Sequence, residues 1–96
     1  MSQNLYELQP RYTTQKSFNG KAMVGIMGNA SILYSYGTKV AVVFSGMSKE
    51  EDVAVVYNVQ SPTTVKHVKE FLKHFGFKAE NKKQIVADYM ENGGNA

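Results

Sequence analysis

The 96 residues suffice for one domain around one hydrophobic core, and a composition of 43% hydrophobic and 11% aromatic residues excludes a disordered chain. The absence of cysteine excludes a disulfide scaffold and a thiolate zinc site, and no run of 18 apolar residues could cross a membrane. The net charge of +3 excludes a strongly acidic surface and is by itself a weak indication of nucleic-acid binding.

Residues 1–18 precede the first predicted strand and are expected to form a flap or an arm. Charged and aromatic side chains alternate toward its end, at Arg11, Tyr12, Lys16, Phe18 and Lys21. Arms that contact nucleic acid have this composition, and so does a flap that packs its rings on a sheet. No export signal is visible in this part of the sequence.

Four short segments between residues 21 and 59 predict the strands of one sheet. They are residues 21–27, 30–36, 39–44 and 52–59, which are rich in β-branched and aromatic residues and bounded by turn residues. Gly28-Asn29 and Gly37-Thr38 suit two-residue hairpin turns, so the strands are expected to form an antiparallel meander.

Two helices are predicted between residues 61 and 91, followed by a frayed tail at residues 92–96. Ser61 suits the N-cap and Pro62 the first helical position, while Gly76 suits a left-handed C-terminal cap. Asn81 and Gln84 indicate the start of the second helix. The expected architecture is therefore a single α+β domain over residues 1–96, with a four-stranded antiparallel meander and two C-terminal helices packed on one face of the sheet.

Hairpin register, taken with these turns, divides the strand residues between two faces. The helix-covered face is expected to carry Ala22, Val24, Ile26, Leu33, Val40, Val42, Phe44, Val53, Val55 and Tyr57. The second face is expected to carry Lys21, Met23, Ile32, Tyr34, Tyr36, Lys39, Ala41, Val43, Ala54, Val56 and Asn58. This second face is too apolar to stay unused, so we expect it to be covered by residues 5–18, paired with another subunit, or used for binding.

The helices carry a second set of candidate binding residues. Lys66, Lys69 and Lys73 form one stripe of the first helix, and Lys82 and Lys83 begin the second. Such a stripe suits phosphates or an acidic protein groove, and it is also typical of an ordinary soluble helix face.

The sequence offers no recognisable catalytic constellation. His67, Glu70 and His74 share one helix face, but a metal site would need a further ligand, and a solvated helix face explains them as well. No phosphate-binding glycine loop, paired carboxylates or serine–histidine arrangement is evident. We therefore expect no enzymatic activity, no cofactor and no metal.

Three parts of the sequence resemble an uncharacterised family of small proteins encoded largely by phages and other mobile elements of Gram-positive bacteria. These parts are residues 16–22 (KSFNGKA), residues 35–40 (SYGTKV), and Thr63-Thr64 with His67, Phe71-Leu72 and Gly76-Phe77. The resemblance implies a protein that acts in the cytoplasm of an infected bacterial cell. The leading expectation is an inhibitor of a host defence complex, of the anti-CRISPR type, directed at a nucleic-acid-guided nuclease. The basic net charge argues against DNA mimicry, which needs a surface of carboxylates.

Three functions consequently stay open. An inhibitor would bind a host protein complex through Lys21, Met23, Tyr34, Tyr36 and Lys39, or through the lysine-bearing helix. A nucleic-acid-binding module would contact DNA or RNA phosphates through the helix lysines and stack bases on tyrosines. A structural accessory protein would form a homodimer through the second face of the sheet.

Overall fold

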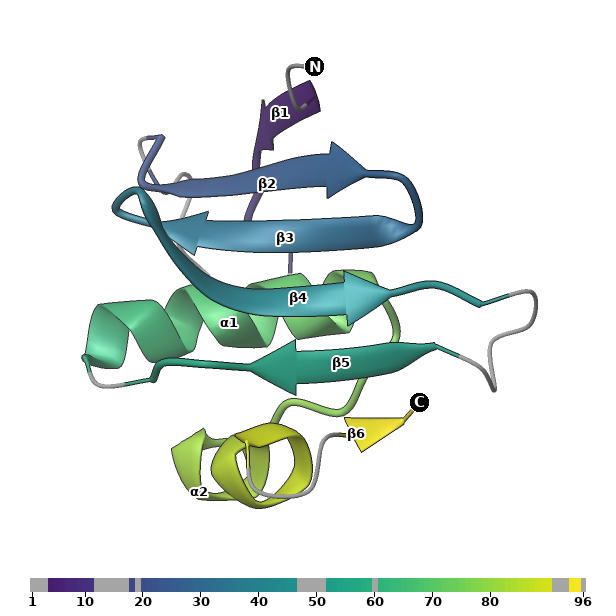
Figure 1. The fold of residues 1–96 in the computed structure, drawn as a ribbon. Helices are drawn as coiled ribbons and strands as arrows, with labels where there is room; N and C mark the ends of the chain where they lie inside the picture. Colours follow the sequence, from purple (N-terminus) through teal and green to yellow (C-terminus); the bar gives the residue numbers. More distant parts are fainter. Residues whose placement is uncertain are drawn as a thin grey trace.

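The computed structural model describes residues 4–11, 18, 20–46, 52–59, 61–90 and 94–95. Five strands come first in the chain, helices follow, and a short strand comes last (Figure 1). The strands are β1 (Asn4–Glu7), β2 (Ala22–Met27), β3 (Ala30–Ser35), β4 (Thr38–Phe44), β5 (Val53–Val56) and β6 (Gly94–Asn95). The helices are α1 (Pro62–His74), α2 (Lys82–Ile85) and the π-helical segment η2 (Val86–Met90).

The sheet is antiparallel throughout, and its strands are ordered as they occur in the chain. The α+β class and the meander order are therefore confirmed. The number of strands exceeds the predicted four, because β1 pairs with β2 and the two-residue β6 pairs with β5. Neither addition gives a sequence signal, since β1 has only four residues of mixed type and β6 is Gly-Asn. The rest of the predicted tail, residues 92, 93 and 96, lies outside the described residues.

The β2–β3 hairpin turns at Gly28-Asn29, as the sequence predicts. Met27 pairs with Ala30 across the turn, and Gly28 has a φ of 60°. A two-residue hairpin turn of this kind needs positive φ, which glycine adopts without steric cost. The resulting register puts the side chains of Val24 and Leu33 on one face, under α1.

The β3–β4 turn lies one residue earlier than the sequence predicts. Its central residues are Tyr36 and Gly37, with φ of 54° and 80°, and Ser35 pairs with Thr38. Positive φ at both central residues matches the twist of the flanking strands, although it is unusual for tyrosine. The prediction of Gly37-Thr38 is therefore wrong.

A β-bulge then shifts the register of β4. Tyr34 pairs with Lys39, whereas Leu33 pairs with Ala41, so Val40 is the extra residue on β4. Val40 remains buried in the core, with 2% of its surface exposed.

The new register reverses the predicted faces of β4 and β5, because a slip of one residue moves every side chain to the opposite face. Four residues predicted for the second face lie in the core instead: Ala41, Val43, Ala54 and Val56. Five residues predicted to lie under the helices project to the other side of the sheet: Val42, Phe44, Val53, Val55 and Tyr57.

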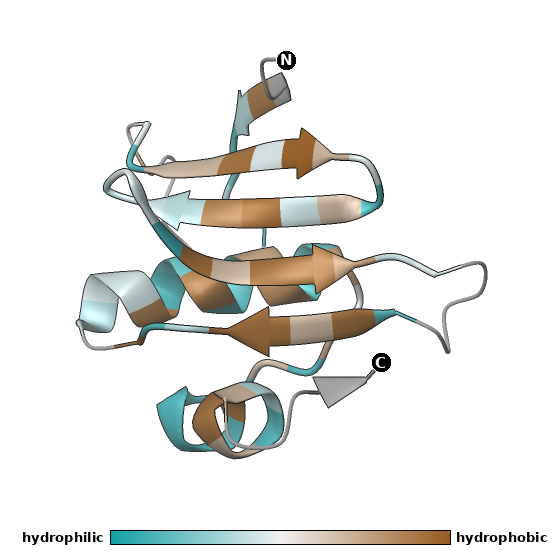
Figure 2. Cartoon of the chain, viewed as in Figure 1, coloured by the Kyte–Doolittle hydropathy of each residue, from teal (hydrophilic) through white to brown (hydrophobic). Residues whose placement is uncertain are grey.

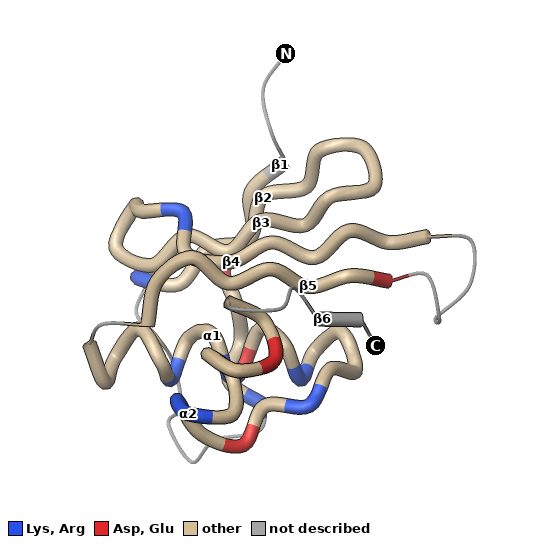
Figure 3. Tube along the Cα trace, turned by 60° about the horizontal axis from the view of Figure 1, so that its bottom comes forward, with Lys and Arg blue, Asp and Glu red and all other residues tan. Residues whose placement is uncertain are grey.

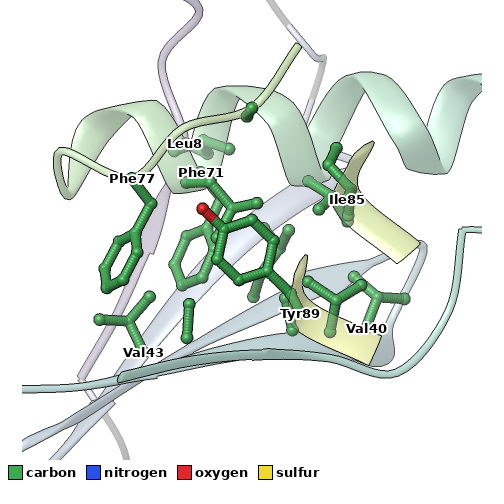
Figure 4. Close-up of a cluster of buried hydrophobic side chains, with 14 of the residues drawn as sticks. Leu8, Val40, Val43, Phe71, Phe77, Ile85 and Tyr89 are labelled. Atoms are coloured by element: carbon green, nitrogen blue, oxygen red, sulfur yellow. The ribbon is translucent and has the colours of Figure 1, made fainter. Parts of the chain in front are cut away.

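The hydrophobic core lies between the sheet and α1, which crosses behind β4 and β5 in Figure 1. Val68, Phe71 and Leu72 of α1 are fully buried against the strand residues of the core. Figure 2 shows hydrophobic residues along the central strands and along part of α1, and the close-up in Figure 4 shows Phe71 above Val43. This face of the sheet is therefore closed to solvent at its centre.

Both ends of α1 follow the sequence signals. The Ser61 side chain accepts a hydrogen bond from the Thr64 N–H, and Pro62 occupies the first helical position. At the other end, Gly76 has a φ of 81° and the Phe77 N–H donates to the Leu72 carbonyl. This glycine cap folds Phe77 back into the core.

The second helix starts at the predicted cap, and its continuation η2 packs beside β5. The Asn81 side chain accepts from the Gln84 N–H, and η2 continues the chain to Met90. Ile85 and Tyr89 point into the core in Figure 4, and the Tyr89 hydroxyl donates to the Lys78 carbonyl at 2.7 Å. Burial raises the pKa of Tyr89.

The described part of residues 1–18 contributes to both the sheet and the core. Strand β1 forms an edge of the sheet, and Leu8 and Phe18 are buried with 1% and 2% of their surface exposed. The Glu70 carboxylate accepts a hydrogen bond from the Arg11 N–H at 2.8 Å, which fastens this segment to α1. Residues 12–17, which include part of the predicted charged and aromatic pattern, lie outside the described residues.

Candidate binding surface

The side of the sheet turned away from α1, called the outer face from here on, carries mostly apolar side chains. In Figure 1 it faces the reader. Register and strand alternation place its members, which are Leu5 and Glu7 on β1, Met23, Gly25 and Met27 on β2, Ala30, Ile32 and Tyr34 on β3, Lys39, Val42 and Phe44 on β4, Val53 and Val55 on β5, and Tyr57 directly after β5. Within the part of the chain that the structure describes, its charged members are Glu7 and Lys39.

Large apolar side chains of the outer face are accessible to solvent. The exposed fractions are 56% for Leu5, 59% for Met27, 41% for Phe44 and 48% for Tyr57. Val42, at the centre, is only 3% exposed because its neighbours on the same face shield it. Soluble monomers seldom expose contiguous apolar patches larger than a few hundred Å² (about 300–600), and larger ones mark binding surfaces.

Three of the predicted sheet residues lie together on this face. Met23 pairs with Tyr34, and Tyr34 pairs with Lys39, so the three side chains form one row across β2, β3 and β4. The Lys39 ammonium lies 5.1 Å from the centre of the Tyr57 ring, a cation–π contact on the same face. Met23 and Tyr34 also line a surface hollow of about 320 Å³, together with Leu5 and Gly37.

The other two predicted sheet residues do not belong to the outer face. Tyr36 lies in the β3–β4 turn, and its ring stands 5.9 Å from the ring of His67 on α1, on the opposite side of the sheet. Lys21 precedes β2 and holds its ammonium 5.5 Å from the Tyr36 ring. The predicted grouping of Tyr36 with Tyr34 is therefore wrong, because the turn starts one residue earlier than predicted.

The helix lysines form a separate surface. Lys66, Lys82 and Lys83 are exposed, while Lys69 and Lys73 are partly buried. Figure 3 shows the basic segments along α1 and α2, with Glu80 between the two helices in the chain. These lysines lie with the helical layer, so they are not part of the outer face.

His67 is a buried structural residue of α1. A hydrogen bond of 2.8 Å joins its Nδ1 to the Ser35 hydroxyl, and the Phe18 ring packs edge-on at 4.7 Å between ring centres. Burial lowers the pKa of His67 below its ordinary value of 6.5, and the neighbouring Lys66 lowers it further. The hydrogen bond between Ser35 and His67 attaches α1 to the end of β3.

We expect this histidine to make stability depend on pH. The unfolded chain takes up a proton near pH 6.5, whereas the folded chain does so only at lower pH, so acid favours unfolding. The free energy of unfolding should be highest above pH 6.5 and should fall as the pH drops below 6.5 toward the pKa of His67 in the folded chain. Urea unfolding at several pH values will show this slope in the wild type and a smaller one in His67→Gln. Parallel curves for the two proteins would refute the assignment.

Glu70 and His74 bond to each other and to the N-terminal segment. The His74 Nε2–H donates to the Glu70 carboxylate at 2.8 Å and to the Gln9 carbonyl at 2.9 Å. His67 bonds instead to Ser35, so the three side chains do not converge. Within the described residues, no group of three or more histidine, aspartate and glutamate side chains could hold a metal ion. No helix in the described ranges is both long and apolar enough to cross a bilayer.

Several members of the outer face escape prediction from the sequence. Leu5 lies in none of the predicted strands, and Phe44, Val55 and Tyr57 are predicted for the helix-covered side. Strand alternation alone does not place them, since both faces of β4 and β5 are apolar. The β-bulge at Val40 reverses these faces, and the sequence gives no signal for it.

The fold and the surface define an α+β domain with an open antiparallel sheet, one face of which packs on helices while the other offers an apolar surface. The family described as a family of unknown function (DUF8033) matches residues 6–87. The chain belongs to this family. Neither the comparison with curated proteins nor that with solved structures found a match.

Proposed function

We propose that the chain is a non-catalytic protein-binding domain and that the outer face is its docking surface. The observation that supports this most is the exposure of 41–59% of Leu5, Met27, Phe44 and Tyr57 on one side of the sheet. Aromatic and methionine side chains around an apolar centre, with few charges, are typical of protein interfaces. Nucleic acid would instead need several cations to neutralise phosphates, and among the described residues this face has Lys39 alone.

The biological role we propose is inhibition of a host defence complex, such as a nucleic-acid-guided nuclease, in the cytoplasm of an infected bacterium. The resemblance to small proteins of phages and mobile elements supports this setting. A small domain can block a larger complex by occupying its surface, which requires an exposed apolar area and no chemistry of its own. The outer face supplies such an area.

Phage infection tests the role and the surface together. In a Gram-positive host with an active nucleic-acid-guided defence nuclease, expression of the wild-type chain should raise the number of plaques. Phe44→Lys should abolish this effect, because it puts a charge into the apolar surface at an exposed position. Plaque counts that respond equally to the wild type and to Phe44→Lys would contradict docking through the outer face.

Nucleic-acid binding is a second candidate, favoured by the lysines of α1 and α2. The double variant Lys66→Glu/Lys69→Glu serves as its matched test, since both positions lie on the helical layer away from the outer face. Under the first proposal this variant retains the effect on plaque number. Loss of the effect in the helix variant, with retention in Phe44→Lys, would favour the second candidate instead.

A further inference from the structure

The outer face has a pattern that fits a second copy of itself. Register aligns Glu7, Met23, Tyr34 and Lys39 in one row across β1, β2, β3 and β4. The row therefore reads acidic, apolar, aromatic, basic, over three strand spacings or about 14 Å. Because the two ends of the row carry opposite charges, the row is complementary to the same row of a second copy that runs in the opposite direction.

A twofold axis that runs parallel to the strands, between β2 and β3, places the row of one copy against the same row of a second copy in the opposite direction. Two copies packed face to face about this axis place Glu7 of each opposite Lys39 of the other, and Met23 opposite Tyr34. Face-to-face packing with nearly aligned strands is the ordinary arrangement of two stacked sheets. A twofold contact also uses the same surface on both copies, as most homodimers do.

The neighbouring rows match in size about the same axis. Gly25 pairs with Ile32 and Met27 pairs with Ala30 across β2 and β3. The axis sets Gly25 of one copy opposite Ile32 of the other, and Met27 opposite Ala30, so each large side chain meets a small residue. Glycine within a strand weakens it and often marks a place where another chain approaches closely.

The charged ends of the row are compatible with this contact. Lys39 is exposed, and its ammonium stands over the Tyr57 ring on the outer face. The Glu7 carboxylate accepts a hydrogen bond from the Gly20 N–H at 2.8 Å at the other end of the row. The hollow beside Met23 and Tyr34, about 320 Å³ in volume, lies where the tyrosine of the second copy would enter.

The size of the face suits a stable dimer. The molecule measures 36 × 32 × 21 Å, and the strands that carry the row lie side by side across the face seen in Figure 1. A standard protein interface takes about 800 Å² from each partner, which is within reach of a contact across that side. Exposed apolar side chains on the face would lose their contact with water in the dimer.

We infer that the outer face binds a second copy of the chain, as a twofold dimer with two Glu7–Lys39 pairs. The inference rests on the proposed function, since it names a partner for the same docking surface. Docking onto a target then requires the dimer to separate, because both contacts use the outer face. The second copy covers the β1–β4 part of this face until the target is present.

Light scattering coupled to size-exclusion chromatography tests the dimer directly. The wild type should elute with twice the 10.7 kDa mass of the chain at high concentration and move toward the monomer mass on dilution. Glu7→Lys and Lys39→Glu, each alone, should raise the dimer dissociation constant about tenfold or more, because like charges then face each other twice. Circular dichroism of both variants checks that they are folded.

The decisive experiment is to mix the two single variants. In the mixed dimer, the new lysine of the Glu7→Lys chain faces the new glutamate of the Lys39→Glu chain. The unchanged Lys39 of the first chain faces the unchanged Glu7 of the second, so both contacts again join opposite charges. An equimolar mixture should therefore form a dimer at a concentration at which each variant alone is monomeric.

Recovery on mixing distinguishes a specific contact from general damage to the fold, which mixing would not repair. A mixture that stays monomeric, or a wild type that is monomeric at every concentration, overturns the inference.

The same data separate this inference from the proposed function. A monomeric wild type whose effect on plaque number still depends on Phe44 overturns the dimer and supports docking of a different protein. A dimer that follows the charge pattern, with plaque numbers that ignore Phe44→Lys, supports the self-contact and contradicts the proposed inhibitory docking.

Discussion

Replacing Val43 with lysine should unfold the domain or reduce its free energy of unfolding by about 4 kcal/mol or more. Val43 is fully buried, with 0% of its surface exposed, and lies in the core beneath Phe71 in Figure 4. A lysine there would bury an unpaired ammonium group, which costs several kcal/mol, and would lose the packing of the valine. Small domains have about 5–15 kcal/mol of stability in total, so most of it would be lost.

The matched control is the same substitution at the next residue. Phe44 projects to the outer face and is 41% exposed, so Phe44→Lys should change the free energy of unfolding by no more than about 1 kcal/mol. Urea unfolding followed by circular dichroism measures both. A stable Val43→Lys together with an unfolded Phe44→Lys would show that β4 has the opposite register.

These two variants also test the part of the fold that the sequence does not predict, which is the assignment of β4 and β5 side chains to the two faces of the sheet. Alternation of apolar and polar residues assigns faces in a strand with one wet side, but β4 and β5 are apolar at nearly every position. Their faces then depend on the β-bulge at Val40, which shifts the pairing of β4 by one residue and so moves its later side chains to the opposite face. Moving the two-residue turn from Gly37-Thr38 to Tyr36-Gly37 changes which residues pair but not which face they share, so it is the bulge, seen only in the structure, that reverses the prediction.

The elements that are predicted well from the sequence carry a local chemical signal. Ser61 before Pro62 marks the start of α1, and Gly76 marks its end, because a cap and a left-handed glycine act through bonds within a few residues. Gly28-Asn29 predicts its hairpin for the same reason. Strand β1 has no such signal, and it pairs with β2 through a contact that is distant in the chain.

The candidate surface is predicted only in part for the same reason. Met23, Tyr34 and Lys39 lie on β2, β3 and the first residues of β4, before the bulge at Val40, and their grouping is confirmed. The strand residues beyond the bulge lie on the faces opposite to those predicted. Tyr36 leaves the group because it is a turn residue, and Phe44 and Tyr57 join it.

Replacing Glu70 with alanine should lower the free energy of unfolding by about 2–3 kcal/mol, the second large effect that we expect. Glu70 is 2% exposed, and its carboxylate accepts hydrogen bonds from the Arg11 N–H and the His74 Nε2–H, each at 2.8 Å. Hydrogen bonds to a charged group are stronger than those between neutral groups. The bond from Arg11 joins α1 to the N-terminal segment, and the bond from His74 joins Glu70 to the last turn of α1. The alanine variant removes the acceptor of the Arg11 N–H and leaves the His74 Nε2–H with the Gln9 carbonyl.

A second glutamate of the same region provides the control. Glu80 lies 3.8 Å from the Lys78 ammonium, and the two side chains are 63% and 62% exposed, so Glu80→Ala should change stability by about 0.5 kcal/mol or less. Urea unfolding compares the two alanine variants, and hydrogen exchange at the Arg11 amide reports on the attachment itself. Exchange there should accelerate in Glu70→Ala and not in Glu80→Ala, because only the former removes the acceptor of the Arg11 N–H. Equal exchange rates in both variants would mean that other contacts hold the N-terminal segment, such as the burial of Leu8 and the His74–Gln9 hydrogen bond.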